Sequence, residues 1–98
     1  MKVKIGINGF GRIGRVALRI AASQPEKYQI CGINLRNADT TYMAYQVKYD
    51  SVFGPFNGTV EAKPNALVVN GQEITVFSES DASKIAWSTC GAEYIIES

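Results

Sequence analysis

A glycine-rich segment near the start of the chain is the feature that most constrains the fold. Gly9, Gly11 and Gly14 match the pattern Gly-x-Gly-x-x-Gly. Val and Ile alternate through residues 3–8 before it, as they do in a half-buried strand. Apolar residues follow it at helical spacing, at Ile13, Val16, Ala17, Ile20 and Ala21. A strand, a glycine turn and a helix in this order predict a dinucleotide site, whereas the glycine pattern alone would be weak evidence.

Each glycine of the pattern has an expected physical role. Gly9 turns the chain sharply because it has no Cβ atom. Gly11 lets the backbone approach a pyrophosphate, and Gly14 lets the helix pack closely on the strand. The helix begins with unpaired N–H groups and the positive end of its dipole, which attract phosphate.

The residues within and after this motif resemble a known family. Residues 8–15, Asn-Gly-Phe-Gly-Arg-Ile-Gly-Arg, are similar to the N-terminal signature of phosphorylating glyceraldehyde-3-phosphate dehydrogenases. Further matches follow in the family's order at residues 48–51, 56–60, 69–71, 74, 83–87 and 91–98. The resemblance therefore covers essentially the whole chain.

The resemblance implies an NAD or NADP site and its residues. It implies that Arg12 and Ile13 offer backbone N–H groups to the pyrophosphate and that Phe10 lies close to the cofactor. Ser98 would approach the nicotinamide ribose, and Ser80 stands where relatives often carry an arginine near the adenine. Ser80 could equally be a helix N-cap or the residue before one. The expected cofactor-binding residues are Asn8, Gly9, Phe10, Gly11, Arg12, Ile13, Gly14, Asn34, Leu35, Arg36, Ser80 and Ser98. Asn8 is expected to tie the loop by hydrogen bonds.

The loop after the second strand bears on the choice between NAD and NADP. An acidic residue here usually binds the adenosine ribose hydroxyls, and in the family an Asp commonly follows the Asn. This chain has Leu35 after Asn34, followed by Arg36. Loss of the carboxylate removes repulsion of a 2′-phosphate, and an arginine suits that phosphate. One hypothesis is tolerance of NADP or preference for it; the other leaves Arg36 solvated while Asp39 reaches the ribose.

The resemblance also implies a reaction that residues 1–98 cannot complete. In the family a cysteine thiolate attacks glyceraldehyde 3-phosphate, a histidine handles the proton, hydride passes to the nicotinamide and phosphate releases the acyl group as 1,3-bisphosphoglycerate. No position here matches that cysteine or histidine, so no catalytic residue is expected in this chain. The chain is expected to be the incomplete N-terminal cofactor domain of a homotetrameric enzyme, without activity alone. Alternatives are a dehydrogenase for erythrose 4-phosphate or a non-catalytic nucleotide-binding module.

Composition narrows the partners further. The chain has 98 residues, 46% of them apolar, and a formal net charge of +1, so neither nucleic acid nor a membrane surface is an expected partner. No signal peptide is evident, which favours a reducing, cytoplasmic location. Cys31 and Cys90 are expected to be structural, and without histidine a Cys–His pair or a histidine-containing metal site is impossible. No metal is expected.

The order of predicted elements gives the fold class. Strands are expected at 3–8, 28–34 and 93–97, with helices at 11–23, from 39 or 40 to 49, and at 81–87. Strands at 57–63, 66–70 and 73–77, with an Asn70-Gly71 turn, predict an antiparallel insertion beside the parallel sheet. The fold is therefore α/β, the first mononucleotide-binding half of a Rossmann-type doubly wound sheet. The ligand should bind at the loops after residues 8, 34 and 97.

Three further expectations concern packing. Met43 and Val47 are expected to pack the second helix, and so are Tyr42, Tyr45 and Tyr49, as aromatic residues at helical spacing often do. Trp87 is expected to be a packing residue. The first strand is expected to lie on an unprotected edge, because the fourth strand of the order 3-2-1-4 is taken to be missing.

Overall fold

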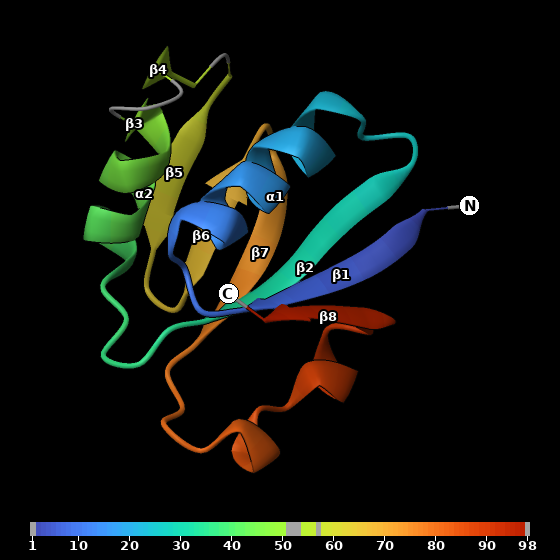
Figure 1. Cartoon of the computed structure of the whole chain (residues 1–98). Coiled ribbons are helices and arrows are strands. Elements are labelled where there is room, and N and C mark those ends of the chain that lie inside the picture. Colours follow the sequence, from blue (N-terminus) through green and yellow to red (C-terminus); the bar gives the residue numbers. More distant parts are fainter. Residues whose placement is uncertain (1, 51–53, 57, 98) are drawn as a thin grey trace.

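The parallel strands and the glycine turn form as the sequence predicts. A computed structural model describes residues 2–50, 54–56 and 58–97. Its main sheet has six strands in the order β5-β6-β7-β2-β1-β8, drawn in Figure 1. β1 (Val3–Asn8) pairs in parallel with β2 (Tyr28–Asn34), and β2 pairs in parallel with β7 (Gln72–Phe77). The sheet is the expected Rossmann-type arrangement, with the carboxyl ends of these strands at one edge.

The first strand is not at an edge, which corrects one expectation. β8 (Tyr94–Glu97) pairs in parallel with β1 and places Glu97 opposite Asn8. The short segment that was expected as another parallel strand is itself the fourth strand of the order 3-2-1-4. β1 is therefore covered on both sides by backbone hydrogen bonds, and in Figure 1 β8 lies at the border of the sheet.

The predicted insertion is continuous with the main sheet. β5 (Val60–Lys63) and β6 (Ala66–Val69) pair antiparallel, and β6 pairs antiparallel with β7. β7 is thus shared, because its carboxyl half runs parallel to β2, so it is not part of a separate antiparallel unit. Asn70 and Gly71 have φ of 51° and 83°, as the predicted two-residue turn requires. Asn57, the expected start of the first of these strands, lies outside the described residues.

Both main helices lie where predicted, and the expected packing residues Met43 and Val47 are buried, but other residues expected to pack are exposed. In α1 (Arg12–Ser23) the buried residues are Gly14, Leu18 and Ala21, whereas Ile13 is 64% exposed and Ile20 is 51% exposed. In α2 (Thr40–Lys48) the buried residues are Met43, Ala44 and Val47. The tyrosines at 42, 45 and 49 are about three-fifths exposed, so the expectation that they pack on the sheet is wrong.

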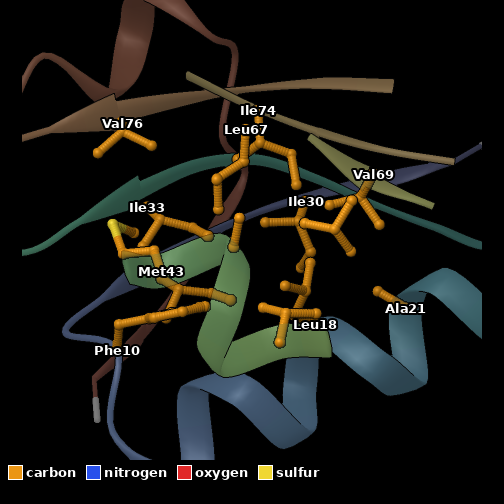
Figure 2. Packing of buried hydrophobic residues seen from close by; sticks show 14 residues of the cluster. Phe10, Leu18, Ala21, Ile30, Ile33, Met43, Leu67, Val69, Ile74 and Val76 are labelled. Carbon is orange, nitrogen blue, oxygen red and sulfur yellow. The ribbon is translucent and has the colours of Figure 1, made fainter. Parts of the chain in front are cut away.

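The core lies between these helices and the sheet. Leu18 of α1, Met43 of α2 and Ile33 of β2 belong to one buried cluster with Phe10 and residues of β6 and β7, as Figure 2 shows. α2 begins after Asp39, whose carboxylate accepts hydrogen bonds from the N–H groups of Thr41 and Tyr42. Asp39 is thus the N-cap, at one of the two positions where the helix is expected to begin. A small ribbon, β3 (Tyr49–Asp50) with β4 (Gly54–Pro55), follows α2 and was not predicted.

Two short 3-10 turns, η1 (Ala82–Lys84) and η2 (Trp87–Thr89), replace the helix predicted at 81–87. Figure 1 shows them beyond β1 and β8, away from α1. The Trp87 ring packs where Gly6 leaves room: a Cβ on Gly6 would lie 2.6 Å from it. Trp87 also meets the Phe77 ring edge-on, with ring centroids 5.4 Å apart. The expected packing role of Trp87 is confirmed.

Candidate functional site

The turn between β1 and α1 has the geometry of a phosphate-binding loop. Gly9 has a φ of 99°, a left-handed conformation that side chains rarely adopt, and its N–H donates to the Asn34 carbonyl oxygen at 2.7 Å. Gly11 is the N-cap of α1 in an extended conformation and supplies no side-chain cap. The first-turn N–H groups of any α-helix have no acceptor within the helix, so those of Arg12, Ile13 and Gly14 face outward for a ligand.

Gly11 is not explained by the fold. Its φ of −78° suits any residue, it is exposed, and a Cβ built on it would find no atom of the described structure within 4 Å. Gly9 differs, because its backbone requires glycine. A glycine kept at an open position over a helix N-terminus fits a ligand that must approach the backbone. The residues present therefore fit the pyrophosphate of a dinucleotide.

Phe10 and Arg15 anchor the turn between β1 and α1. The Phe10 side chain is only 4% exposed and belongs to the core cluster, beside the β2 and α2 residues in Figure 2. The Arg15 Nη1 atom donates to the Phe10 carbonyl oxygen at 2.9 Å. The structure thus gives the Phe10 side chain an anchoring role in the core, and only its backbone is left for a bound cofactor.

A chain of side-chain hydrogen bonds crosses the carboxyl ends of four strands. Asn34, at the end of β2, is 5% exposed; its Nδ2 atom donates to Asn8 Oδ1 at 3.0 Å and to the Glu79 carbonyl oxygen at 3.1 Å. Its Oδ1 atom accepts from the Glu79 N–H at 2.9 Å. Asn8 Nδ2 in turn donates to Glu97 Oε1 at 3.2 Å. The expected loop-tying role of Asn8 therefore has defined partners on β2 and β8.

An open pocket of about 490 Å³ lies over this hydrogen-bonded edge. It is lined by Asn8, Gly9, Asn34, Leu35, Arg36, Glu79, Ser80 and Glu97. β2 and β7 lie on one side of β1, whereas β8 lies on the other side. Open α/β sheets bind ligands at the point where the strand order switches sides in this way. The pocket begins at Gly9, so it continues the phosphate-binding turn. Six of the expected site residues line it.

The remaining expected residues lie elsewhere, and two unexpected ones join the pocket. Gly11, Arg12 and Ile13 are exposed at the start of α1, and Gly14 is buried within it. Ser98 lies outside the described residues. Glu79 and Glu97 were not predicted as site residues, although each follows or ends a strand at the expected ligand edge, which was a usable signal.

Arg36 lines the pocket, whereas Asp39 does not. Leu35 is partly buried against the core, and Arg36 is exposed on the pocket wall. Asp39 caps α2 with both of its bonds on one oxygen and does not line the pocket. The structure thus gives Asp39 a defined structural role and places Arg36 at the pocket.

Ser80 lines the pocket but does not cap the turn that follows it. That role belongs to Asp81, whose Oδ1 atom accepts from the hydroxyl and the N–H of Ser83. These two hydrogen bonds lower the pKa of Asp81 below its ordinary value. Ser80 is therefore the residue before the cap, one of the two structural roles foreseen for it.

Two properties of the described residues concern metal binding and membrane insertion. Within the described residues no group of three or more His, Cys, Asp and Glu is placed to hold a metal ion. Across those same residues, no helix has the length and apolar character needed to cross a membrane.

Comparison with known proteins agrees with the site. A family model described as "Glyceraldehyde 3-phosphate dehydrogenase, NAD binding domain" matches residues 3–98. The chain is 55% identical over 98 residues to glyceraldehyde-3-phosphate dehydrogenase of Lentinula edodes, covering 100% of this chain and 29% of that protein. It is 54% identical over 98 residues to glyceraldehyde-3-phosphate dehydrogenase 2 of Mucor circinelloides f. lusitanicus, with 100% and 29% covered.

A third relative shows the same partial coverage. The cytosolic glyceraldehyde-3-phosphate dehydrogenase of Leishmania mexicana is 53% identical over 96 residues, covering 98% of this chain and 28% of that protein. The chain thus spans under a third of the length of these relatives, in the part that the family model assigns to the cofactor. The chain belongs to the family of NAD-binding domains of glyceraldehyde-3-phosphate dehydrogenase, for which NAD is the cofactor.

Proposed function

We propose that this chain binds NAD with the pyrophosphate over Gly11 and the adenosine in the pocket beside it. The N–H groups of Arg12 and Ile13, at the first turn of α1, hold the phosphate oxygens. The ribose and adenine lie among Leu35, Arg36 and Ser80, and the nicotinamide lies toward Glu97, where Ser98 follows. The observation that carries this proposal is the open space above Gly11, which no requirement of the fold explains.

The proposed role within a longer protein is oxidation of glyceraldehyde 3-phosphate in the presence of phosphate. NAD, when bound, supplies the hydride acceptor. The chain's own residues bind and orient it, because the polar edge from Glu79 to Glu97 fixes the loops that surround the pocket. We further propose that the complete enzyme is a cytoplasmic homotetramer and that residues 1–98 alone bind the cofactor without turnover.

Calorimetric titration of the purified protein with NAD tests the binding site. A valine at position 11 suits the extended backbone, and its Cβ would have no described atom within 4 Å, so the fold should survive. It would occupy the space of the pyrophosphate, and we expect Gly11→Val to weaken NAD binding at least tenfold. Ala62→Val, at an exposed position on β5, serves as the control. Unchanged affinity in Gly11→Val, with circular dichroism like that of the parent, would remove the proposal.

NADP is a second candidate cofactor. Asp39 is committed to the α2 cap, Leu35 cannot accept a hydrogen bond, and Arg36 lies on the pocket wall, so a 2′-phosphate has a cationic partner there. Glu79 lines the same pocket, and its negative charge would repel a 2′-phosphate. We expect NADP to bind within tenfold of NAD, a difference of about 1.4 kcal/mol. Titration with both dinucleotides tests this expectation. If NADP binds more than tenfold more weakly than NAD, NADP is excluded as a cofactor.

The substrate is tested with the whole protein. Turnover of glyceraldehyde 3-phosphate with phosphate would support the proposed activity, whereas faster turnover of erythrose 4-phosphate would favour that related dehydrogenase. A protein that binds NAD and oxidises neither aldehyde would be the non-catalytic module.

A further inference from the structure

The two cysteines of the chain lie against each other although 59 residues separate them in sequence. The Sγ atoms of Cys31 and Cys90 are 3.0 Å apart, and both are free thiols. Cys31 belongs to β2, and Cys90 ends the η2 turn on the side of the sheet that Trp87 covers. Neither residue lines the cofactor pocket, so the proposed function does not account for the pair.

The backbone of β2 directs Cys31 toward this contact. The pairing of β1 with β2 runs Ile5 to Ile30 and then Gly6 to Gly32, which leaves Cys31 as an extra residue in β2. A bulge of this kind re-aims a side chain. Gly32 next to it provides room, since a Cβ there would lie 3.1 Å from the Cys90 Sγ atom.

The two thiols differ in access to solvent. Cys31 is buried, whereas Cys90 is half-buried. Burial, followed by the contact with Cys90, raises the pKa of Cys31 to about 12, so Cys31 stays protonated at neutral pH. Lys4 lies beside Gly91, the residue after Cys90, since a Cβ on Gly91 would be 3.5 Å from the Lys4 Nζ atom. A small reagent thus reaches Cys90 first, and Cys31 is the neighbouring thiol that reacts second.

We propose that Cys31 and Cys90 are an oxidative modification site that forms an intramolecular disulfide when the protein meets a small disulfide or hydrogen peroxide. With a disulfide RS–SR, the Cys90 sulfur attacks one sulfur atom, the S–S bond breaks, and the leaving RS⁻ takes up the Cys90 proton as RSH. Cys31 then displaces the second RS group, and its proton leaves with that thiol. The two cysteines together lose two protons and two electrons, and RS–SR takes them up to become two RSH. With peroxide, Cys90 becomes a sulfenic acid with loss of water, and attack by Cys31 releases a second water.

The bond ties the crossing segment to the sheet. Residues 78–93 connect β7 to β8 and carry both 3-10 turns. In the thiol form this segment is held on β1 and β2 by Trp87 packing and by the backbone bond from the Glu93 N–H to the Lys4 carbonyl oxygen at 2.8 Å. Because Cys31 and Cys90 are 59 residues apart in sequence, a covalent link between them closes a long loop and restricts the unfolded chain strongly. We expect the thermal midpoint to rise by about 10 °C or more.

Treatment of the purified protein with glutathione disulfide, followed by peptide mapping without reductant, tests the proposal. The expected product is a cross-linked peptide pair containing Cys31 and Cys90, with slower proteolysis of residues 78–93. Dithiothreitol should reverse both changes and the rise in thermal midpoint. Cys90→Ala should show neither cross-link nor shift, and Cys31→Ala should stop at glutathione on Cys90.

Three results would overturn the site. These are a lasting mixed disulfide on Cys90 of the parent protein with Cys31 free, disulfides only between molecules, or an unchanged thermal midpoint after complete cross-linking. Because the decisive map uses the unsubstituted protein, poor folding of a variant does not obscure it. NAD titration of the thiol form stays a separate test, so failure here leaves the proposed function intact.

Discussion

The side chains of Asn8 and Asn34 meet at 3.0 Å across the paired ends of β1 and β2. Both are the last residues of their strands, and the pair is extended by Glu79 on one side and Glu97 on the other. Asn34 is buried with its amide satisfied on both atoms. This arrangement holds the loops that begin at the sheet edge in a fixed relation, which a binding site made of loops needs.

The first prediction concerns this network. Asn34→Ala removes the buried amide and leaves its Asn8 and Glu79 partners without it, so we expect a loss of about 2 kcal/mol in the free energy of unfolding. NAD affinity should fall as well, because the loops on both sides lose their link. Urea unfolding and calorimetry measure the two effects. Asn8→Ala, which leaves the Asn34 bonds to Glu79, should cost less; an equal or greater cost would contradict the central role of Asn34.

The second prediction concerns the approach of η2 to the sheet. A Cβ on Gly6 would lie 2.6 Å from the Trp87 ring and 2.9 Å from the Ile95 side chain. We expect Gly6→Ala to destabilise the protein by about 2 kcal/mol, because the indole must move. Thermal unfolding measures this. In a Trp87→Leu background the same Gly6→Ala change should cost less stability, because the indole is gone. If the stability losses of the two substitutions simply add in the double variant, the proposed clash is wrong.

The third prediction separates capping from ribose binding at Asp39. Asp39→Ala removes the acceptor of the Thr41 and Tyr42 N–H groups and should cost about 1 kcal/mol of stability. NAD affinity should stay within about twofold of the parent, since Asp39 does not line the pocket. Asp39→Ser, which can still cap, is the control for stability. A large loss of NAD affinity in both variants would restore Asp39 as the ribose ligand.

The fourth prediction concerns cofactor choice at residues 35 and 36. Leu35→Asp places a carboxylate at the pocket wall, where it would accept ribose hydroxyl groups and repel a 2′-phosphate. We expect NADP affinity to fall at least tenfold while NAD affinity is kept or raised. Arg36→Ala should lower NADP affinity alone. Equal effects of Arg36→Ala on both dinucleotides, measured by titration, would show that this arginine does not select the phosphate.

The fifth prediction concerns alkaline pH. The pKa of Cys31 is raised from 9.0 to about 12 in the folded protein, mainly by burial. The neutral thiol is favoured by folding, so its contribution is fully present below pH 9 and is lost as pH rises from 9 toward 12. We expect the free energy of unfolding to fall in this range, and more steeply than in Cys31→Ala. Identical pH profiles of the two proteins under reducing conditions would contradict the shift.

The sequence predicted those parts of the protein whose physical causes are local. The alternation of β1, the left-handed Gly9, the Asp39 cap and the Asn70-Gly71 turn each depend on a few adjacent residues, and each is present as expected. The open Gly11 at the start of a helix also came from the local pattern. These features are enough to indicate a strand, a glycine turn and a helix built for phosphate.

Tertiary structure decided what depends on residues far apart in the chain. The packing face of α1 was only partly predicted: Ala21 of the expected stripe is buried, but Ile13 and Ile20 of that stripe are exposed, and Leu18 is buried instead. The pairing of β8 with β1, the chain from Glu79 through the two asparagines to Glu97, and the contact of Cys31 with Cys90 all join distant segments. Such contacts depend on how the strands are ordered in the sheet, and residue spacing within one element carries no information about that order.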